Sequence, residues 1–262
     1  MNLIKKLAPI VKNAGKILLE AHSCKIESNV IEKSGDVNFV TQFDIQTQEF
    51  LISSILKVIP NACFMAEEQE NDPSVLQREY CFVIDPIDGT TNFIHNYKRS
   101  SISVAMFSFG VPVLGIIYDP YLDEMFWAEK GKGAYVNGER MIVSDRDISK
   151  AVVSYGTSPY YKDELAYKTF DLCKEIIMVA ADLRRTGSAA IDLANLAAGR
   201  TDAFFELRLS PWDIAAGYVL ITEAGGKITD LYGNEIDFTR PSPVFASNTI
   251  VYDKLLSITS KY

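Results

Sequence analysis

The sequence predicts a layered α/β protein that is built in two halves. Amphipathic helical stretches open the chain, short apolar runs of strand length follow, and helices alternate with strands beyond residue 150. The 262 residues, 48% of them hydrophobic, suffice for a large core. We therefore expect an N-terminal α+β half over residues 1–145 and a C-terminal α/β half over residues 146–262.

The first half begins with two amphipathic helices. Apolar residues recur at three- and four-residue spacing over residues 3–21, and a second such stretch runs from about 44 to 58, before Pro60-Asn61. Runs of strand length then follow at 63–66, 80–84, 101–109, 111–118, 125–128 and 134–136. Gly110 and the pair Asn137-Gly138 mark tight turns between strands. The pattern predicts a mostly antiparallel sheet.

The second half alternates between the two kinds of element. Strands are expected at 151–155 and 202–207 and near residues 183, 227 and 244. Helices are expected at about 162–178, 188–198 and 212–223 and near residue 251. Gly225-Gly226 ends the third of these helices. Because no internal repeat is visible, function is expected in local groups of residues.

Charge and cysteine content narrow the function classes. A net charge of −8 argues against a nucleic-acid partner, which would need clustered Lys and Arg. An acidic chain that handles an anionic substrate would instead need metal cations. No apolar stretch reaches the roughly 18 residues of a membrane span, so we expect no membrane and a cytoplasmic protein. The four cysteines form no CxxC pair and are expected to be reduced thiols.

The segment from Phe82 to Asn92 is the most informative stretch of the chain. A strand delivers Asp85, Pro86 is expected to fix a turn, and Asp88 follows three residues later. Gly89-Thr90-Thr91 then opens a helix whose first N–H groups are free. Two carboxylates beside such a helix start predict a place where hard cations and a phosphate meet. A plain turn with an Asp cap is the alternative.

Two further acidic positions complete the pattern. Glu67-Glu68 follows an apolar strand and Asp213 lies in the first turn of a helix. Taken singly, the pair is typical of a solvated charge run and Asp213 of an acid favoured by the helix dipole. Mg²⁺ takes oxygen ligands that it shares with substrate phosphate. The joint pattern therefore predicts several Mg²⁺ sites, formed by Glu67, Asp85, Asp88 and Asp213.

These segments together resemble the inositol monophosphatase family of lithium-sensitive, Mg²⁺-dependent phosphatases. The matching stretches are Asp85 to Asn92, Ala66-Glu67-Glu68, Trp212 to Gly217, Val40 to Asp44, and Lys33, which falls in the family's mobile metal-site loop. Ala66 and Asn38 depart from the usual Gly and Asp, and neither departure removes a ligand. The resemblance implies an α/β/α/β/α sandwich of the inositol monophosphatase and fructose bisphosphatase type, and a homodimer.

The resemblance also implies the roles of the site residues, with two or three Mg²⁺ per subunit. Glu67, Asp85 and the carbonyl of Ile87 would hold one ion, and Asp85, Asp88 and Asp213 a second. Glu67 with waters would hold a weaker third. The implied catalytic residues are Thr90, Asp44 and Glu67, with Thr90 and Asp44 orienting and deprotonating the attacking water. Backbone N–H groups of Gly89, Thr90 and Thr91 would bind phosphate, while Gly187, Ser188, Ala189 and Glu206 would line the sugar site.

The substrate implied is a small-molecule phosphomonoester, with inositol 1-phosphate favoured over other sugar or nucleoside monophosphates. NADP 2′-phosphate and 3′-phosphoadenosine 5′-phosphate stay open, because Arg184, Arg185 and Arg208 lie near the site in sequence, although we interpret them as structural ion pairs. A helix cap at Ser188 and an exposed strand end at Glu206 are the plain alternatives for those two positions.

Other classes of protein fit the residues less well. Aspartyl-phosphate phosphatases place their two Asp side chains two residues apart, whereas Asp85 and Asp88 are three apart. The chain carries no phosphate loop of the nucleotide hydrolases, no Cys-x₅-Arg and no Ser-His-Asp motif. A non-catalytic scaffold would have lost a carboxylate or Thr90, and all of these residues are present.

Overall fold

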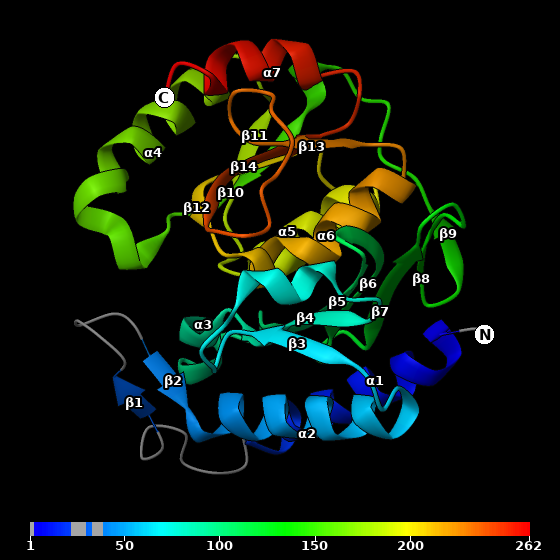
Figure 1. The fold of residues 1–262 in the computed structure, drawn as a ribbon. Helices are drawn as coiled ribbons and strands as arrows, with labels where there is room; N and C mark the ends of the chain where they lie inside the picture. Colours follow the sequence, from blue (N-terminus) through cyan, green and yellow to red (C-terminus); the bar gives the residue numbers. More distant parts are fainter. Residues whose placement is uncertain (1–2, 22–29, 33–38) are drawn as a thin grey trace.

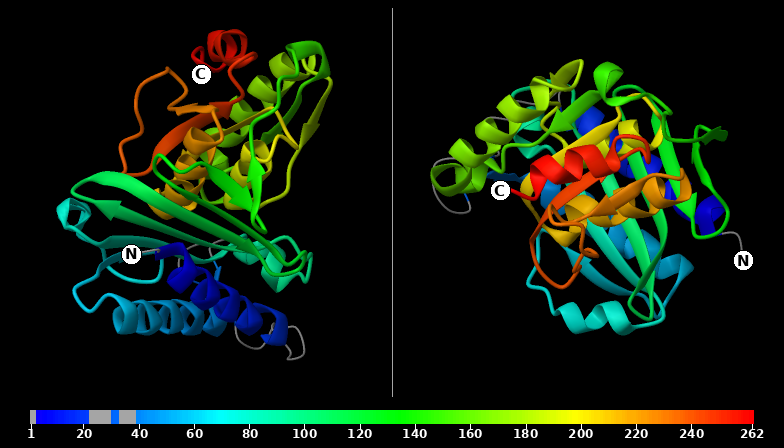
Figure 2. Two further views of the ribbon diagram at one scale, coloured as in Figure 1. Left: turned by 90° about the vertical axis from the view of Figure 1, so that its right-hand side faces the viewer. Right: turned by 90° about the horizontal axis from the view of Figure 1, so that it is seen from above.

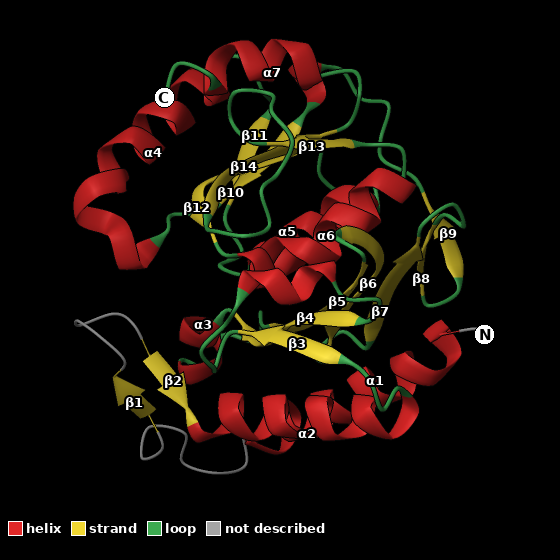
Figure 3. Ribbon diagram, viewed as in Figure 1, coloured by secondary structure: helices red, strands yellow, loops and turns green. Residues whose placement is uncertain are grey.

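The computed structural model describes residues 3–21, 30–32 and 39–262. Helices and sheets alternate in stacked layers, which Figures 1 and 3 show edge on and Figure 2 from two further sides. From the bottom of Figure 1 upward, the helical layers are α1 (Leu3–Ala21) with α2 (Gln42–Val58), α5 (Ala189–Ala197) with α6 (Pro211–Glu223), and α4 (Lys162–Ile177) with α7 (Tyr252–Thr259). One sheet lies between each pair of helical layers, so the predicted α/β/α/β/α sandwich is confirmed.

The larger sheet belongs to the first half and has seven strands in the order of the chain. They are β3 (Cys63–Ala66), β4 (Cys81–Asp88), β5 (Ser101–Ser108), β6 (Val111–Asp119), β7 (Glu124–Glu129), β8 (Ala134–Val136) and β9 (Glu139–Met141). Only the β3–β4 pair is parallel, as a mostly antiparallel sheet requires. Phe109-Gly110 and Asn137-Gly138 all have positive φ, which is the geometry of tight two-residue hairpin turns.

The smaller sheet has the strand order β11-β10-β12-β14-β13. Its strands are β10 (Val152–Tyr155), β11 (Asp182–Arg184), β12 (Ala203–Leu209), β13 (Lys227–Thr229) and β14 (Ser242–Ser247). The short elements are α3 (Thr90–Ile94) and the 3₁₀ helices η2 (Pro73–Gln77), η3 (Ile148–Lys150) and η4 (Pro159–Tyr161). A small hairpin of β1 (Val30–Glu32) and β2 (Phe39–Thr41) was not expected from the sequence.

Helices α5 and α6 join the two sheets into one core. Their small residues allow a very close approach: a Cβ on Gly115 of β6 would lie 2.5 Å from the carbonyl oxygen of Ala216. Likewise, a Cβ on Gly217 would lie 2.5 Å from Leu193. Apolar side chains of both sheets meet around these helices in a single buried cluster. The division at residue 145 stays a prediction, since the halves are tightly packed against each other.

The opening helix buries one face, as its spacing predicted. Ile4, Leu7, Val11 and Leu18 of α1 are buried against the larger sheet, while its lysines face outward. In the part of the chain that the structure describes, no helix combines the length and the apolar character that crossing a membrane requires. Among the described residues, the thiols of Cys63, Cys81 and Cys173 are free, and Cys24 lies outside the described residues.

Candidate functional site

A cleft between the two sheets gathers most of the residues that the sequence marks. Its empty space, including the part that is open to solvent, is about 700 Å³. The predicted site residues that line it are Glu67, Asp85, Ile87, Asp88, Gly89, Thr90, Thr91, Gly187, Ser188, Ala189, Glu206 and Asp213. Asp44 lies behind Thr90 and is fully buried. Lys33 lies outside the described residues. Segments more than a hundred residues apart thus meet at one place.

The strand that carries Asp85 differs from its sequence prediction. β4 continues through Asp88, and Pro86 does not form a turn. Instead, the register with β5 shifts between Asp85 and Asp88, because proline has no N–H for the ladder and is tolerated at such an irregularity. Asp85 accepts the N–H of Ile87 on its Oδ1, at 3.0 Å. Gly89, at φ 87°, then starts α3 in the left-handed region that favours glycine.

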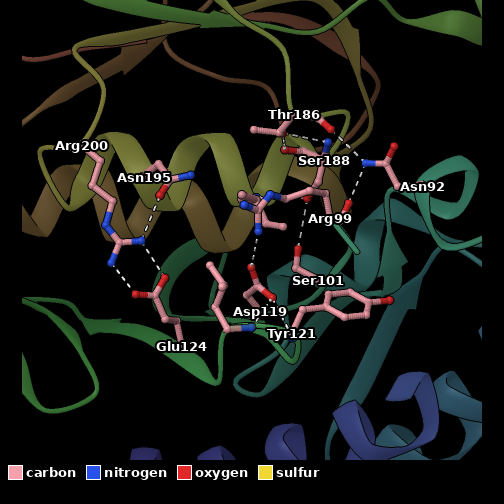
Figure 4. A network of polar contacts seen from close by, with 12 residues as sticks. Asn92, Arg99, Ser101, Asp119, Tyr121, Glu124, Thr186, Ser188, Asn195 and Arg200 are labelled. Atoms are coloured by element: carbon pink, nitrogen blue, oxygen red, sulfur yellow. Dashed lines mark hydrogen bonds and ion pairs between the residues drawn. The ribbon is translucent and has the colours of Figure 1, made fainter. Parts of the chain in front are cut away.

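Asp88 is held in place by groups from two other elements. Its Oδ2 accepts hydrogen bonds from the hydroxyl of Ser188 and, at 2.8 Å, from the N–H of Ala190. Ser101 of β5 donates to the same oxygen at 3.4 Å, and Figure 4 shows Ser101 beside Ser188. Ser188 also caps α5 through the N–H of Ile191. The helix-cap alternative for Ser188 is therefore correct, and its hydroxyl orients a carboxylate.

Asp213 is fixed by the start of its own helix. Its Oδ2 accepts the N–H of Ser210 at 2.6 Å, and Pro211 opens α6 at a position where no N–H is needed. The carbonyl of the neighbouring Trp212 accepts a hydrogen bond from Ser103 of β5 at 3.2 Å. The first turn of α6 is thus pinned to the larger sheet, with Asp213 at the cleft.

Burial and mutual repulsion disfavour the ionised form of the carboxyl groups in the cleft. Burial raises the pKa of Asp85 well above its usual range, and the charges of Glu67, Asp88 and Asp213 raise it further. Burial also raises the pKa of Asp213, and the charges of Glu67 and Asp88 raise it further. Glu67 also shares a hydrogen bond with Asp85. This crowding of buried acids is what a divalent cation relieves.

The donors fit Mg²⁺ in kind, since all are oxygens: the four carboxylates and the carbonyl of Ile87. Within residues 3–21, 30–32 and 39–262, no three acidic, His or Cys side chains converge as a finished ligand set. These oxygens are the groups that would hold a divalent cation.

A threonine and a buried aspartate form a pair at the inner wall of the cleft. Oγ1 of Thr90 lies 3.4 Å from Oδ1 of Asp44 and 3.2 Å from the carbonyl oxygen of Ile87. The other oxygen of Asp44 accepts from Thr41, at 2.7 Å from its N–H and 2.5 Å from its hydroxyl. This capping box at the start of α2 leaves one Asp44 oxygen for Thr90. The chain thus places a hydroxyl next to a buried base.

Glu206 is a buried side chain, so the alternative of an exposed strand end is wrong. Only 6% of the residue is exposed, and its Oε1 accepts the N–H of Ser158 at 2.7 Å and its hydroxyl at 3.2 Å. Burial raises the pKa of Glu206 from 4.5 to about 7. At neutral pH this carboxyl is therefore close to half protonated.

The raised pKa of Glu206 predicts a pH-dependent stability. Between about pH 4.5 and pH 7 the folded state binds more protons at this group than the unfolded state, so stability falls as the pH rises through that window. The shift corresponds to roughly 3 kcal/mol at pH 8. Glu206→Gln removes this cost, and we expect its Tm to exceed that of the wild type at pH 8 and to match it near pH 5.

Thermal unfolding of both proteins in EDTA across this range measures the effect. Glu175→Gln is the matched control, because Glu175 pairs with Lys261 at the surface and has a lowered pKa. Parallel pH curves for the wild type and Glu206→Gln would contradict the prediction.

The three arginines near the site have three different environments. Arg184 pairs with Asp182 at 2.5 Å, and Arg208 lies over the ring of Tyr161 at 4.3 Å from its centroid. Arg185 lines the cleft and donates to Oγ1 of Thr157 at 3.2 Å. The interpretation as structural ion pairs therefore holds for Arg184 only, and Arg185 brings positive charge to the site.

Several residues at the cleft were not predicted. Asp192 lies in the first turn of α5, is buried, and accepts the hydroxyl of Thr186 at 2.8 Å. Asn92 bridges the halves by donating to the carbonyls of Arg99 at 2.6 Å and Thr186 at 2.9 Å (Figure 4). Tyr160 also lines the cleft. An acid at a helix start and a tyrosine in a loop carry no sequence signal that separates them from surface residues.

The fold and the cleft define the class of protein. Buried carboxylates, an all-oxygen donor set, a hydroxyl on a buried Asp and a glycine turn, set between two sheets of an α/β/α/β/α sandwich, are features of a metal-assisted phosphatase. The model of the inositol monophosphatase family matches residues 2–262. The chain belongs to this family, which is a family of phosphatases.

Relatives support this membership over nearly the whole chain. The fructose-1,6-bisphosphatase/inositol-1-monophosphatase of Aquifex aeolicus is 34% identical over 258 residues, covering 98% of this chain and 95% of its own length. Nus factor SuhB of Escherichia coli is 34% identical over 247 residues, covering 94% and 91%. The crystal structure of extragenic suppressor protein suhB from Bartonella henselae has a TM-score of 0.91 at 32% identity, covering 100% of this chain and 99% of that one.

Proposed function

We propose that the protein hydrolyses inositol 1-phosphate and related sugar or nucleoside monophosphates by direct attack of water. The observation that carries this proposal is the position of the Thr90–Asp44 pair next to the carboxylate cluster in one cleft. A hydroxyl beside a buried base suits general-base chemistry on water. No covalent enzyme intermediate is needed.

The metal-binding roles go to the carboxylates. Glu67 and Asp85, with the carbonyl of Ile87, would hold one Mg²⁺, and Asp85, Asp88 and Asp213 another, with two or three ions per subunit. When bound, the ions would acidify the attacking water, neutralise the leaving alkoxide and clamp the phosphoryl oxygens. Ser188 and Ser210 support this set, because they fix Asp88 and Asp213 by hydrogen bonds.

The chain's other residues act on water and phosphate. Thr90 orients the attacking water and passes its proton towards Asp44, whose other oxygen is held by Thr41. Backbone N–H groups of Gly89, Thr90 and Thr91 bind the phosphate, because the first N–H groups of a helix have no acceptor within it. Ala190 is not available for this task, since its N–H is donated to Asp88.

The sugar side of the cleft suits a polyol. Glu206 and the stretch from Gly187 to Ala189 line it, and a carboxyl that is near half protonation both donates and accepts hydrogen bonds. Gly187 leaves room for Asn92, since a Cβ there would lie 2.9 Å from the amide nitrogen of Asn92. These features support inositol as the preferred leaving group.

Arg185 supports a second candidate, a substrate with a second phosphate. Its guanidinium lines the same cleft, and such a group pairs with phosphate. Fructose 1,6-bisphosphate, NADP and 3′-phosphoadenosine 5′-phosphate are the compounds to compare. The Aquifex aeolicus relative carries both fructose-1,6-bisphosphatase and inositol-1-monophosphatase in its name.

A substrate panel at fixed Mg²⁺ separates the two candidates. We expect the highest kcat/KM for inositol 1-phosphate. We expect Arg185→Ala to lower kcat/KM about 10-fold for any bisphosphorylated substrate and to change the inositol 1-phosphate value by less than about 2-fold. Arg184→Ala is the matched control, because that side chain pairs with Asp182. A bisphosphate with a much higher kcat/KM than inositol 1-phosphate would overturn the preferred substrate.

The proposal extends to the setting of the enzyme. From the family resemblance we expect Li⁺ inhibition, a homodimer and a cytoplasmic location. From the acidic charge and the lack of a long apolar stretch we expect no nucleic-acid or membrane partner. Sedimentation measures the oligomeric state directly.

A further inference from the structure

The connection between β10 and α4 passes along the cleft from the second half of the chain. We call its residues Gly156 to Tyr161 the strap. Four of them line the cleft: Gly156, Thr157, Pro159 and Tyr160. The carboxylates Glu67 and Asp85, which come from the first half, line the same cleft. The strap is therefore one of the segments of the second half that face the candidate phosphate site.

The strap is fastened at its base. Ser158 adopts a left-handed backbone, with φ 42°, and gives both its N–H and its hydroxyl to Glu206. Gly156 donates its N–H to the carbonyl of Phe205 at 3.0 Å, and a Cβ on Gly156 would come within 1.8 Å of the Glu206 carboxylate. The following turn closes through the N–H of Tyr161, which is donated to Ser158 at 2.8 Å. These contacts fix where Tyr160 stands.

Tyr160 brings a phenol into the cleft. Pro159 sets its backbone at the start of η4, and the residue is 43% exposed while lining the cleft. Glu67, Asp85 and Asp213 line the same cleft. An ordinary phenol is neutral at pH 7, so Tyr160 adds a neutral hydrogen-bond donor to a cleft that is rich in carboxylates.

A neutral donor has a specific use at this place. A phosphoryl group presents three oxygens, and the proposed backbone donors at Gly89 to Thr91 all belong to one turn of the first half. A lysine on the strap would pair with the carboxylates and compete with cations for them. A phenol donates a hydrogen bond without that competition.

We propose that Tyr160 contacts the substrate, donating a hydrogen bond from its hydroxyl to the phosphoryl group of the phosphomonoester, opposite the turn at Gly89–Thr91. Glu206 and Ser158 act as positioning residues for it through the strap. This inference rests on the proposed phosphatase function. It differs from a sugar contact, because a phosphoryl contact serves every substrate of the enzyme.

Tyr160→Phe tests the inference, since it removes one oxygen and keeps the ring. With Mg²⁺ present, we expect kcat/KM to fall about 10-fold for both inositol 1-phosphate and p-nitrophenyl phosphate, mainly through KM, and Kd for inorganic phosphate to rise by a similar factor. The Tm should stay unchanged. Tyr167→Phe is the matched control, because Tyr167 is 86% exposed on α4.

The outcomes separate this inference from the proposed function. Unchanged kinetics and phosphate affinity in Tyr160→Phe would overturn it, as would a loss confined to inositol 1-phosphate, which would place the phenol on the sugar. If the wild type hydrolyses neither ester, the proposed function fails. Calorimetric binding of inorganic phosphate with Mg²⁺ then still decides whether Tyr160 contacts the phosphoryl group.

Discussion

Asp213→Asn is expected to lower kcat/KM by about 10³-fold or more and at the same time to stabilise the protein in the absence of Mg²⁺. Loss of one carboxylate from the proposed metal set removes several kcal/mol of transition-state stabilisation. The folded state, by contrast, loses a carboxyl group whose ionisation is disfavoured by burial and by the charges of Glu67 and Asp88. The amide oxygen of Asn can still accept the N–H of Ser210, so the start of α6 stays capped.

Two measurements check this result together. Phosphate release at saturating Mg²⁺ gives the activity, and thermal unfolding in EDTA gives the stability, where we expect Tm to rise by roughly 2 to 4 °C for each kcal/mol gained. Asp202→Asn is the matched control. Asp202 is also fully buried, but it pairs with Arg146 at 2.9 Å, so the same substitution there should destabilise the fold and leave the activity in place.

Either half of the result can fail on its own. Wild-type turnover in Asp213→Asn would remove Asp213 from the metal set. A lower Tm in EDTA, like that expected for Asp202→Asn, would mean that the carboxylate has a compensating partner and that the cleft is not short of positive charge.

The cleft positions of the proposed metal carboxylates could be predicted from sequence because local rules place them. Asp85 and Asp88 sit on one strand end, and Asp213 falls at the N3 position of a helix that starts with Pro211. Each position is fixed by its own segment. The stacking of the two sheets then brings these segments to one cleft, and that step was available only through the family resemblance.

The remaining features depend on contacts between distant segments. Ser188 reaches Asp88 across 100 positions, and Ser158 reaches Glu206 across 48. Tyr160 lies in the short 3₁₀ helix η4, which has no apolar periodicity, and it lines the cleft together with residues of both halves. Pairing between distant segments also explains Pro86. The local sequence around this proline predicts a turn, whereas pairing with β5 keeps β4 extended around it. Sequence pattern reports local preference, and tertiary pairing overrides it.

Thr90→Ala is expected to lower kcat by about 10² to 10⁴-fold with a smaller effect on KM, which is the range for loss of acid–base assistance. Among the described side chains, the Thr90 hydroxyl donates only to Asp44, and its other acceptor is the backbone carbonyl of Ile87. The substitution therefore disconnects the buried base while leaving the carboxylates and the backbone of α3 in place. Substrate binding through backbone N–H groups should persist, so KM changes little.

Thr90→Ser separates the hydroxyl from the methyl group, since Ser keeps the Oγ that faces Asp44. Recovery of most of the activity in this variant indicates proton transfer through the hydroxyl. Equal losses in Thr90→Ala and Thr90→Ser would instead assign Thr90 a packing role, because residue 90 is 6% exposed. Single turnover of a substrate made chiral at phosphorus with oxygen isotopes and sulfur completes the argument: one direct attack by water inverts the configuration at phosphorus. Retention would identify a phosphoenzyme that forms and breaks in two displacements, and Thr90 would then have no water to orient in the first step.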